Sequence, residues 1–112
     1  MWVFLYVMLH GHPMPPCPGE FERILLERYE VGENDCSNKA GQYARACNAA
    51  GHHATVIIVR PPGEHQDLHA IVEVDGLYCD PTTGRVTHAL ADHGERVTDV
   101  SAYHLNNDEE FA

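Results

Sequence analysis

Hydrophobic residues follow two different periods along this chain of 112 residues. Between residues 20 and 50 they recur at spacings of three and four, which predicts two amphipathic helices. After residue 54 they form short runs rich in valine and isoleucine, separated by turn residues, which predicts strands. We therefore expect the helices to precede most of the sheet.

The first helix is expected over residues 20–30, because its apolar positions fit one helical face. Acidic Glu20 and Glu22 suit its first turn, where they favour the positive end of the helix dipole, and Gly32 is expected to end it. The positions on this face are Phe21, Ile24, Leu25 and Arg28, with Leu26 and Tyr29 beside them.

The second helix follows a capping position at Asn34 or Asp35 and ends near Gly51. Its apolar stripe consists mostly of small residues, so this helix can approach a sheet closely. Cys47 lies within the stripe and is interpreted as a packing residue. The stripe comprises Ala40, Tyr43, Ala44, Cys47 and Ala50.

The strand pattern begins with residues 55–59, which are apolar on both faces and therefore predict a central strand. Strands are also expected over 69–74, 77–80 and 85–90, with a turn at 80–84. Residues 97–105 fit neither period cleanly and are expected to form a strand or a helix. Residues 2–9 are expected to form a buried strand or a short helix, and 106–112 an acidic tail.

The dipeptide Asp75-Gly76 is a strong signal for a two-residue hairpin turn, and it fixes the strand register. Val74 then faces Leu77, Glu73 faces Tyr78, Val72 faces Cys79 and Ile71 faces Asp80. One face carries Ala70, Val72, Val74, Leu77 and Cys79; the other carries His69, Ile71, Glu73, Tyr78 and Asp80. His69 and Asp80 are thus diagonal neighbours, roughly 7–8 Å apart at Cα, close enough for imidazole to meet carboxylate.

Charge and cysteine usage limit the class of protein. The formal net charge is −10, from 17 acidic against 7 basic residues, which argues against nucleic-acid binding and favours a basic partner or substrate, or only solubility. The four cysteines lack CxxC or zinc-finger spacing, and Cys36 and Cys47 would lie about 16 Å apart on one helix. We expect reduced thiols, a cytoplasmic location and no cofactor.

The N-terminal apolar run has neither a basic flank nor a small-residue cleavage site, and it is too short to cross a bilayer. We therefore expect no membrane association. The length of the chain leaves room for one core, so we expect a single domain over 1–112.

Cys36, His69 and Asp80 together meet the requirements of a nucleophilic thiol site. A cysteine at a helix start lies in a field that favours its thiolate, and an adjacent imidazolium lowers the pKa of a thiol. A carboxylate orients that imidazole. Unpaired backbone N–H groups at the helix start can face a developing oxyanion.

Three segments carry a family resemblance: Asn34-Asp35-Cys36-Ser37-Asn38-Lys39-Ala40, His69-Ala70-Ile71-Val72-Glu73-Val74 and Tyr78-Cys79-Asp80-Pro81-Thr82-Thr83-Gly84. They resemble the motifs of the transglutaminase-like superfamily of papain-like cysteine hydrolases, and the motif-bearing core spans about 34–90. The resemblance implies an α+β fold, in which a helix N-terminal to an antiparallel sheet of three to five strands carries the cysteine.

The resemblance also implies a thioester intermediate on an amide or peptide substrate, with Cys36 as nucleophile, His69 as general base and acid, and Asp80 as the orienting residue. Asn34, Asp35, Glu73 and Tyr78 are candidates for oxyanion or substrate contacts. Two features depart from the family pattern: Ile71 replaces a frequent aromatic residue, and Glu30 stands where a side-chain oxyanion donor is sought.

Two other classes of function remain open. The chain could keep this fold as a catalytically silent binding or assembly module that recognises a protein partner. A metal-binding protein could use some of the nine histidines, with His10 and His12 as the first candidates. The default expectation for His52, His53, His65, His88, His93 and His104 is a surface position.

Overall fold

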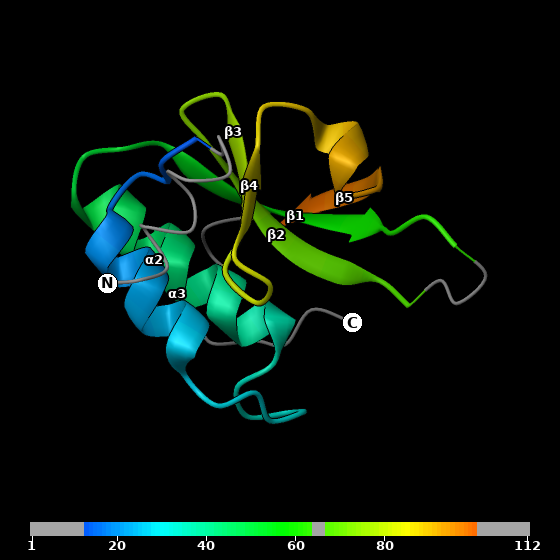
Figure 1. Cartoon of the computed structure of the whole chain (residues 1–112), viewed down its shortest axis with the longest axis horizontal. Helices are drawn as coiled ribbons and strands as arrows, with labels where there is room; N and C mark the ends of the chain where they lie inside the picture. The colour runs from blue at the N-terminus through cyan, green and yellow to red at the C-terminus, as the bar shows by residue number, and fades with distance from the viewer. Residues whose placement is uncertain (1–12, 64–66, 101–112) are drawn as a thin grey trace.

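A computed structural model describes residues 13–63 and 67–100 (Figure 1). Its elements are α2 (Pro18–Leu26), α3 (Cys36–Ala49), β1 (Ala54–Arg60), β2 (His69–Val74), β3 (Leu77–Asp80), β4 (Arg85–Thr87), the 3-10 helix η1 (Leu90–Asp92) and β5 (Glu95–Val100). The predicted element at 2–9, the tail at 106–112, and His10, His12, His65 and His104 lie outside the described residues.

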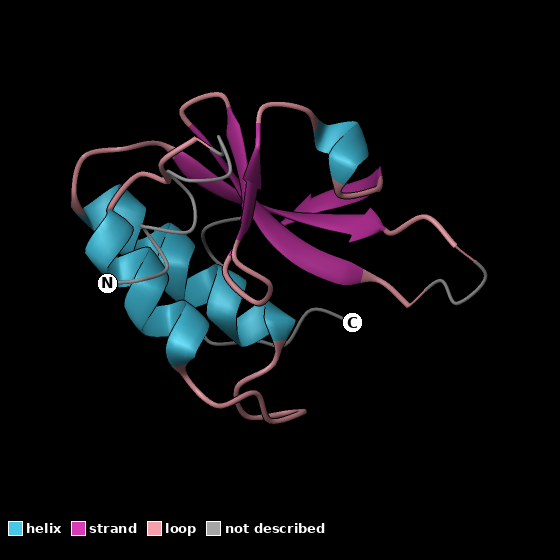
Figure 2. Ribbon diagram, in the orientation of Figure 1, coloured by secondary structure: helices cyan, strands magenta, loops and turns pink. Residues whose placement is uncertain are grey.

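The strands form one antiparallel sheet in the order β4-β3-β2-β1-β5 (Figure 2). The predicted central strand is β1, which pairs with β2 on one side and β5 on the other. The open choice at 97–105 is resolved as strand up to residue 100, because β5 hydrogen-bonds to β1 there. The described part of the chain is therefore an α+β fold with two α-helices and a five-stranded sheet.

The main core lies between the sheet and helices α2 and α3, which cover the same face (Figure 1). Small residues on α3 allow the close approach that the sequence predicted, with Ala40 and Ala44 fully buried. Tyr43 packs edge-to-face on Phe21 of α2, with ring centroids 5.2 Å apart. Residues of the apolar hairpin face complete this core: Ala70, Val72, Val74, Leu77 and Cys79.

A second, smaller core covers the opposite face of the sheet. Ile57, Val59 and Ile71 are fully buried there, and Tyr78 and Leu90 pack against them. Leu90 belongs to η1, so this short helix protects the face that α2 and α3 leave open. Apolar residues on both faces of β1 are explained by these two cores.

Helix α2 ends earlier than predicted. It stops at Leu26, where the backbone of Glu27 becomes extended, and Gly32 lies in a separate turn. The buried ammonium of Lys39 on α3 donates to the carbonyls of Leu25 and Glu27, at 3.2 and 2.7 Å. These bonds satisfy carbonyls that a helix end leaves without partners, so α3 fixes where α2 stops.

The β2–β3 hairpin follows the register predicted from its turn. Asp75 and Gly76 both have positive φ, 53° and 78°, as a type I′ turn requires. The ladder contains three of the four predicted pairs: Val74–Leu77, Glu73–Tyr78 and Val72–Cys79. A one-residue slip would exchange the two faces of both strands, so this turn decides which side chains meet.

Replacing Gly76 by alanine tests this turn. A Cβ at Gly76 meets no atom within 4 Å, so the cost comes only from the left-handed backbone. We expect the free energy of unfolding to fall by about 1 kcal/mol in urea denaturation. Gly19→Ala is the matched control, since Gly19 is equally open but lies within α2. Gly19→Ala should raise the free energy of unfolding by about 0.5 kcal/mol. If the two variants changed the free energy of unfolding equally, the left-handed turn would not be what requires glycine at position 76.

Candidate active site

Cys36 is the first residue of α3, directly after the helix cap. Asp35 Oδ1 accepts the backbone N–H groups of Ser37 and Asn38 at 3.2 and 3.4 Å, and Asn38 Oδ1 accepts the N–H of Asp35 at 3.2 Å. This reciprocal capping box fixes the start of the helix at one residue. The thiol therefore lies in the first turn, where the helix dipole favours negative charge.

His69 and Asp80 meet as the hairpin register predicted. His69 Nε2 lies 2.8 Å from Asp80 Oδ2, and the two side chains are 22 % and 6 % exposed. The other carboxylate oxygen, Oδ1, accepts the backbone N–H groups of Thr82 and Thr83 at 2.9 and 3.3 Å. The turn after β3 thus holds the Asp80 carboxylate in one orientation, with one oxygen directed at His69.

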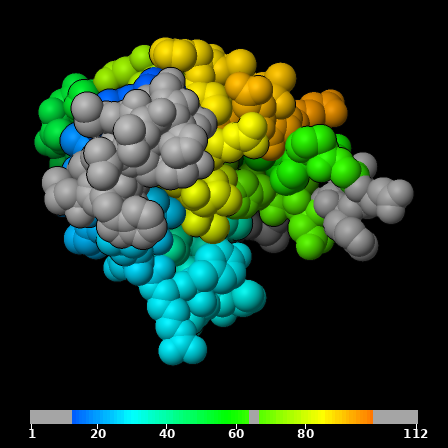
Figure 3. Space-filling model, in the orientation of Figure 1, coloured from blue at the N-terminus to red at the C-terminus, as the bar shows by residue number. Residues whose placement is uncertain are grey.

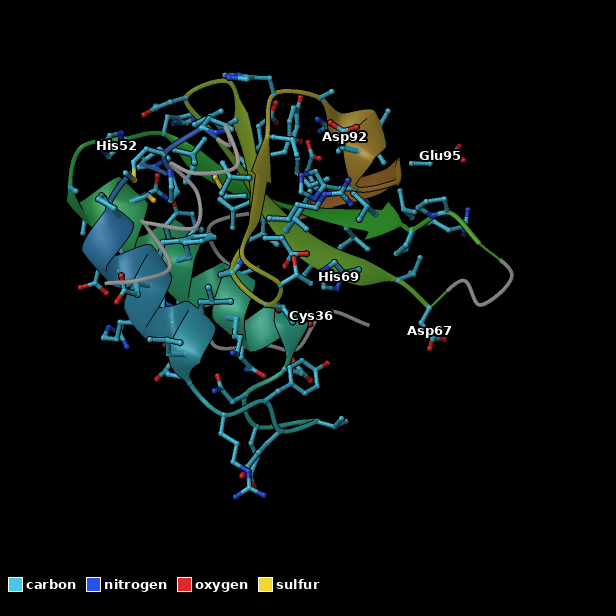
Figure 4. All side chains as sticks on the ribbon, viewed as in Figure 1. Cys36, His52, Asp67, His69, Asp92 and Glu95 are labelled. Atoms are coloured by element: carbon cyan, nitrogen blue, oxygen red, sulfur yellow. The ribbon has the colours of Figure 1, made fainter. Side chains whose placement is uncertain are left out.

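Cys36 and His69 contact each other across the boundary between α3 and β2 (Figure 4). The two side chains line one small pocket and interact electrostatically, and because Nε2 faces Asp80, Nδ1 is the ring nitrogen left for the thiol. The backbone N–H of Ala70 also faces the sulfur. A small pocket of about 20 Å³ opens at this point; its lining residues are Cys36, Ser37, Ile58, Leu68, His69 and Ala70.

The charges of the three residues support one another. Burial by itself would raise the pKa of Cys36, but the hydrogen bonds from His69 and from the Ala70 N–H outweigh it and lower that pKa. Burial would likewise lower the pKa of His69, yet its bonds to Asp80 and Cys36 raise it to about 10. The pKa of Asp80 is lowered, mainly by His69 against the effect of burial. The arrangement favours a thiolate–imidazolium pair.

The other three cysteines lie apart from this pair, in the main core around Tyr43. The Tyr43 hydroxyl donates to the Pro16 carbonyl and lies 3.9 Å from Cys79 Sγ. Burial raises the pKa of both Cys47 and Cys79 to about 12. Cys47 is fully buried, which confirms its prediction as a packing residue.

Two of the four candidates for oxyanion or substrate contacts, Asn34 and Asp35, form hydrogen bonds around the start of α3. Asn34 Nδ2 donates to the Arg28 carbonyl at 2.7 Å, and its Oδ1 accepts from Gln42 at 3.3 Å. Asp35 is the helix cap. These two residues therefore shape the start of α3.

Glu73 and Tyr78 form a separate polar group on the far face of the hairpin from the main core. The Tyr78 hydroxyl donates to Glu73 Oε2 at 3.1 Å, and Arg96 of β5 donates to Glu73 Oε1 at 3.3 Å. Neither residue lines the pocket at Cys36. The structure brings Cys36, His69 and Asp80 together but leaves this pair outside that group.

Buried polar residues that the sequence analysis missed support the site. Lys39 is 2 % exposed, and burial lowers its pKa while the charges of Glu27 and Asp80 oppose that shift. His93, predicted at the surface, is 6 % exposed and contacts Thr87 Oγ1 of β4 at 3.0 Å. Burial lowers the pKa of His93. The residues next to Lys39 and His93 in the sequence do not indicate that these two side chains are buried, because the partners of both lie on other elements.

A larger hollow of about 500 Å³ lies at the start of β5, and Cys36, His69 and Asp80 do not line it. Its lining residues are Arg60, Pro61, Pro62, Ala91, Gly94 and Glu95. Within residues 13–63 and 67–100, no group of three or more His, Cys, Asp or Glu side chains is arranged to hold a metal ion. Across the same residues, no helix has the length and apolar character needed to span a membrane.

No protein-family model, curated protein or solved structure matches this chain.

The lowered pKa of Cys36 predicts selective alkylation. At pH 6 iodoacetamide should modify Cys36 at least about tenfold faster than the other three cysteines, because only a thiolate reacts quickly. The raised pKa values of Cys47 and Cys79 keep both protonated at that pH. Peptide mass spectrometry after timed quenching measures each rate. His69→Asn should slow the alkylation of Cys36 to the rate of the other cysteines. Equally slow labelling of all four cysteines in the wild type would disprove a thiolate at Cys36.

The His69–Asp80 pair predicts a pH-dependent stability. The contribution of Asp80, whose pKa is lowered, is present above the unfolded value of about 4 and is lost as pH falls through its lower folded pKa. The contribution of His69 is present below about 6.5 and is lost as pH rises toward 10. Asp80→Asn should therefore lower the free energy of unfolding by about 2 kcal/mol near pH 6.

This difference between wild type and Asp80→Asn should shrink as pH falls through the lowered pKa of Asp80, and also as pH rises toward 10. Urea denaturation at several pH values measures it. Asp99→Asn is the control, since Asp99 forms an exposed ion pair with Arg96 and should cost less than about 0.5 kcal/mol. A difference that does not vary with pH would mean that the charge of Asp80 is not what stabilises the pair.

Proposed function

We propose that this protein is a cysteine hydrolase or acyl transferase that cleaves an amide or peptide bond through a thioester intermediate. The observation that carries the proposal is that Cys36, the first residue of a helix, lines one pocket with His69, whose ring is hydrogen-bonded to Asp80. A thiol of lowered pKa, beside an imidazole of raised pKa, is the pair that such chemistry needs.

In the first step the Cys36 thiolate attacks the carbonyl carbon of the substrate. The S–C bond forms, and the carbonyl electron pair moves onto oxygen, giving a tetrahedral oxyanion. Asp35 Oδ1 holds the N–H groups of Ser37 and Asn38, so the N–H of Cys36 is the backbone donor proposed for this oxyanion. The dipole of α3 also favours negative charge at this end of the helix.

The second step expels the amine and requires a proton. His69 Nδ1–H faces the sulfur and donates this proton to the leaving nitrogen as the C–N bond breaks, which leaves the acyl group on Cys36 as a thioester. Asp80 on Nε2 keeps the ring in the orientation and tautomer that place Nδ1 at the thiol. Neutral His69 then removes a proton from the acceptor that attacks the thioester.

The acceptor decides between the two reactions. Water gives hydrolysis, whereas a primary amine gives acyl transfer, and both use the same three residues. The resemblance of the three motifs to the transglutaminase-like superfamily is compatible with either, and so is the α+β arrangement of the helix and sheet. The net charge of −10 favours a basic protein or peptide substrate.

A substrate panel with three variants tests this proposal. Wild-type protein should release amine from some peptide or amide members of a substrate library, or thiol from its thioester members. Cys36→Ala should abolish this release, and His69→Ala should reduce it by at least about 10³-fold. Asp80→Asn should lower kcat by about 10²- to 10⁴-fold while KM changes little. Cys79→Ala is the matched control, because it removes a thiol that lies in the core.

Trapping of the intermediate completes this experiment. Rapid acid quenching should reveal an acyl adduct on Cys36 by intact-mass analysis, and Cys36→Ser should not accumulate it. Absence of turnover and adduct across the panel would favour the binding-module alternative. In that case a protein partner captured by the wild type should bind Cys36→Ala with unchanged affinity.

A further inference from the structure

The pocket beside Cys36 has a reacting side and an apolar wall. The reacting side consists of Cys36, Ser37 and His69. The apolar wall is formed by Ile58, Leu68 and Ala70. An acyl group attached to the Cys36 sulfur begins at this pocket, so the wall meets whatever side chain that group carries next to its carbonyl carbon.

The inner part of the wall is fixed by the fold. Ile58 of β1 and Ala70 of β2 are direct partners in the strand ladder, and they are 5 % and 1 % exposed. Both residues belong to the main core between the sheet and the helices. Because such a core is closely packed, a larger group pressed against these two side chains would have to displace core residues. The pocket therefore cannot deepen.

Leu68 forms the outer part of the wall. It directly precedes His69, the first residue of β2, and is 40 % exposed. The described residues between β1 and β2, 61–63 and 67–68, project at one side of the molecule (Figure 3). Leu68 lies outside both of the cores that the described residues form. Its side chain can therefore be shortened without opening a cavity in either core.

The volume of the pocket leaves room for one small group. A cavity needs roughly 10–15 Å³ to hold one water molecule. The pocket at Cys36 measures about 20 Å³, so it can accept a group of similar size, and its apolar wall favours a methyl group. The hollow of about 500 Å³ at the start of β5 cannot receive this group, because neither Cys36 nor His69 lines it.

We propose that this pocket receives the side chain of the substrate residue whose carbonyl carbon Cys36 attacks, and that it restricts this residue to glycine or alanine. The inference rests on the acyl-transfer function proposed above and names the class of its peptide substrates. As the S–C bond forms, the hydrogen or methyl group of that residue lies against the apolar wall. A leucine side chain would collide with this wall and hold the carbonyl carbon away from the sulfur, so the selectivity acts on the acylation step.

A series of N-acetyl amino-acid 4-nitrophenyl esters tests this size limit. Attack by the Cys36 thiolate forms the S–C bond, breaks the ester C–O bond and releases 4-nitrophenolate, whose absorbance reports the acylation rate. Rates are corrected for the background of Cys36→Ala and divided by the rates with N-acetylcysteine, which removes differences in intrinsic reactivity. We expect the glycyl and alanyl esters to acylate Cys36 at least about tenfold faster than the leucyl ester.

Shortening Leu68 should relax this selectivity. Leu68→Ala should bring the rates of the alanyl and leucyl esters within about threefold of each other, and Leu68→Val should give an intermediate ratio. Leu26→Ala is the matched control, since it shortens another exposed leucine, on α2, that does not line the pocket. It should keep the ratio of the wild type. Cooperative urea unfolding of all three variants shows that folded proteins are compared.

The possible failures are distinguishable. If the wild type reacts with the leucyl ester as fast as with the alanyl ester, the size limit is wrong and the proposed function still stands. An unchanged ratio in Leu68→Ala would likewise overturn the assignment of the limit to this pocket. If iodoacetamide alkylates Cys36 but none of the three esters acylates it, the proposed function is rejected, and the inference about the pocket with it.

Discussion

The hydrogen bond between His69 Nε2 and Asp80 Oδ2 is the interaction on which the site depends. It pairs two mostly buried groups, and each is kept charged by the other against the cost of burial. The bond also determines which ring nitrogen is left for Cys36. If it were absent, the imidazole would lose both its orientation and the stabilisation of its cationic form, and the pKa of the thiol would rise toward its ordinary value.

The rest of the fold holds the two halves of this site against each other. The hairpin turn at Asp75-Gly76 sets the register of the strands that carry His69 and Asp80. The capping box at Asp35 sets where α3 begins and therefore where Cys36 lies. Small residues on α3 let the helix approach the sheet closely enough for the thiol to meet the imidazole. The site thus joins two locally determined segments through one packed interface.

The parts of the structure that the sequence predicted are those governed by neighbouring residues. A two-residue turn fixes its own hairpin, and the period of the α3 stripe follows from the helix itself. The end of α2 was predicted wrongly, because Lys39, thirteen residues after Leu26, binds the final carbonyls of α2. His93 was likewise expected at the surface but is buried against Thr87. In both cases a polar residue finds its partner on another element.

By itself, the sequence determined the helix stripe that carries Cys36, the hairpin register, and the contact between His69 and Asp80. These depend on local backbone geometry and on side chains that alternate with a fixed period. Only the tertiary structure decided that Cys36 meets the imidazole. That contact joins two segments whose separation in space is set by core packing and by hydrogen bonds between elements, and no spacing along the chain encodes such a distance.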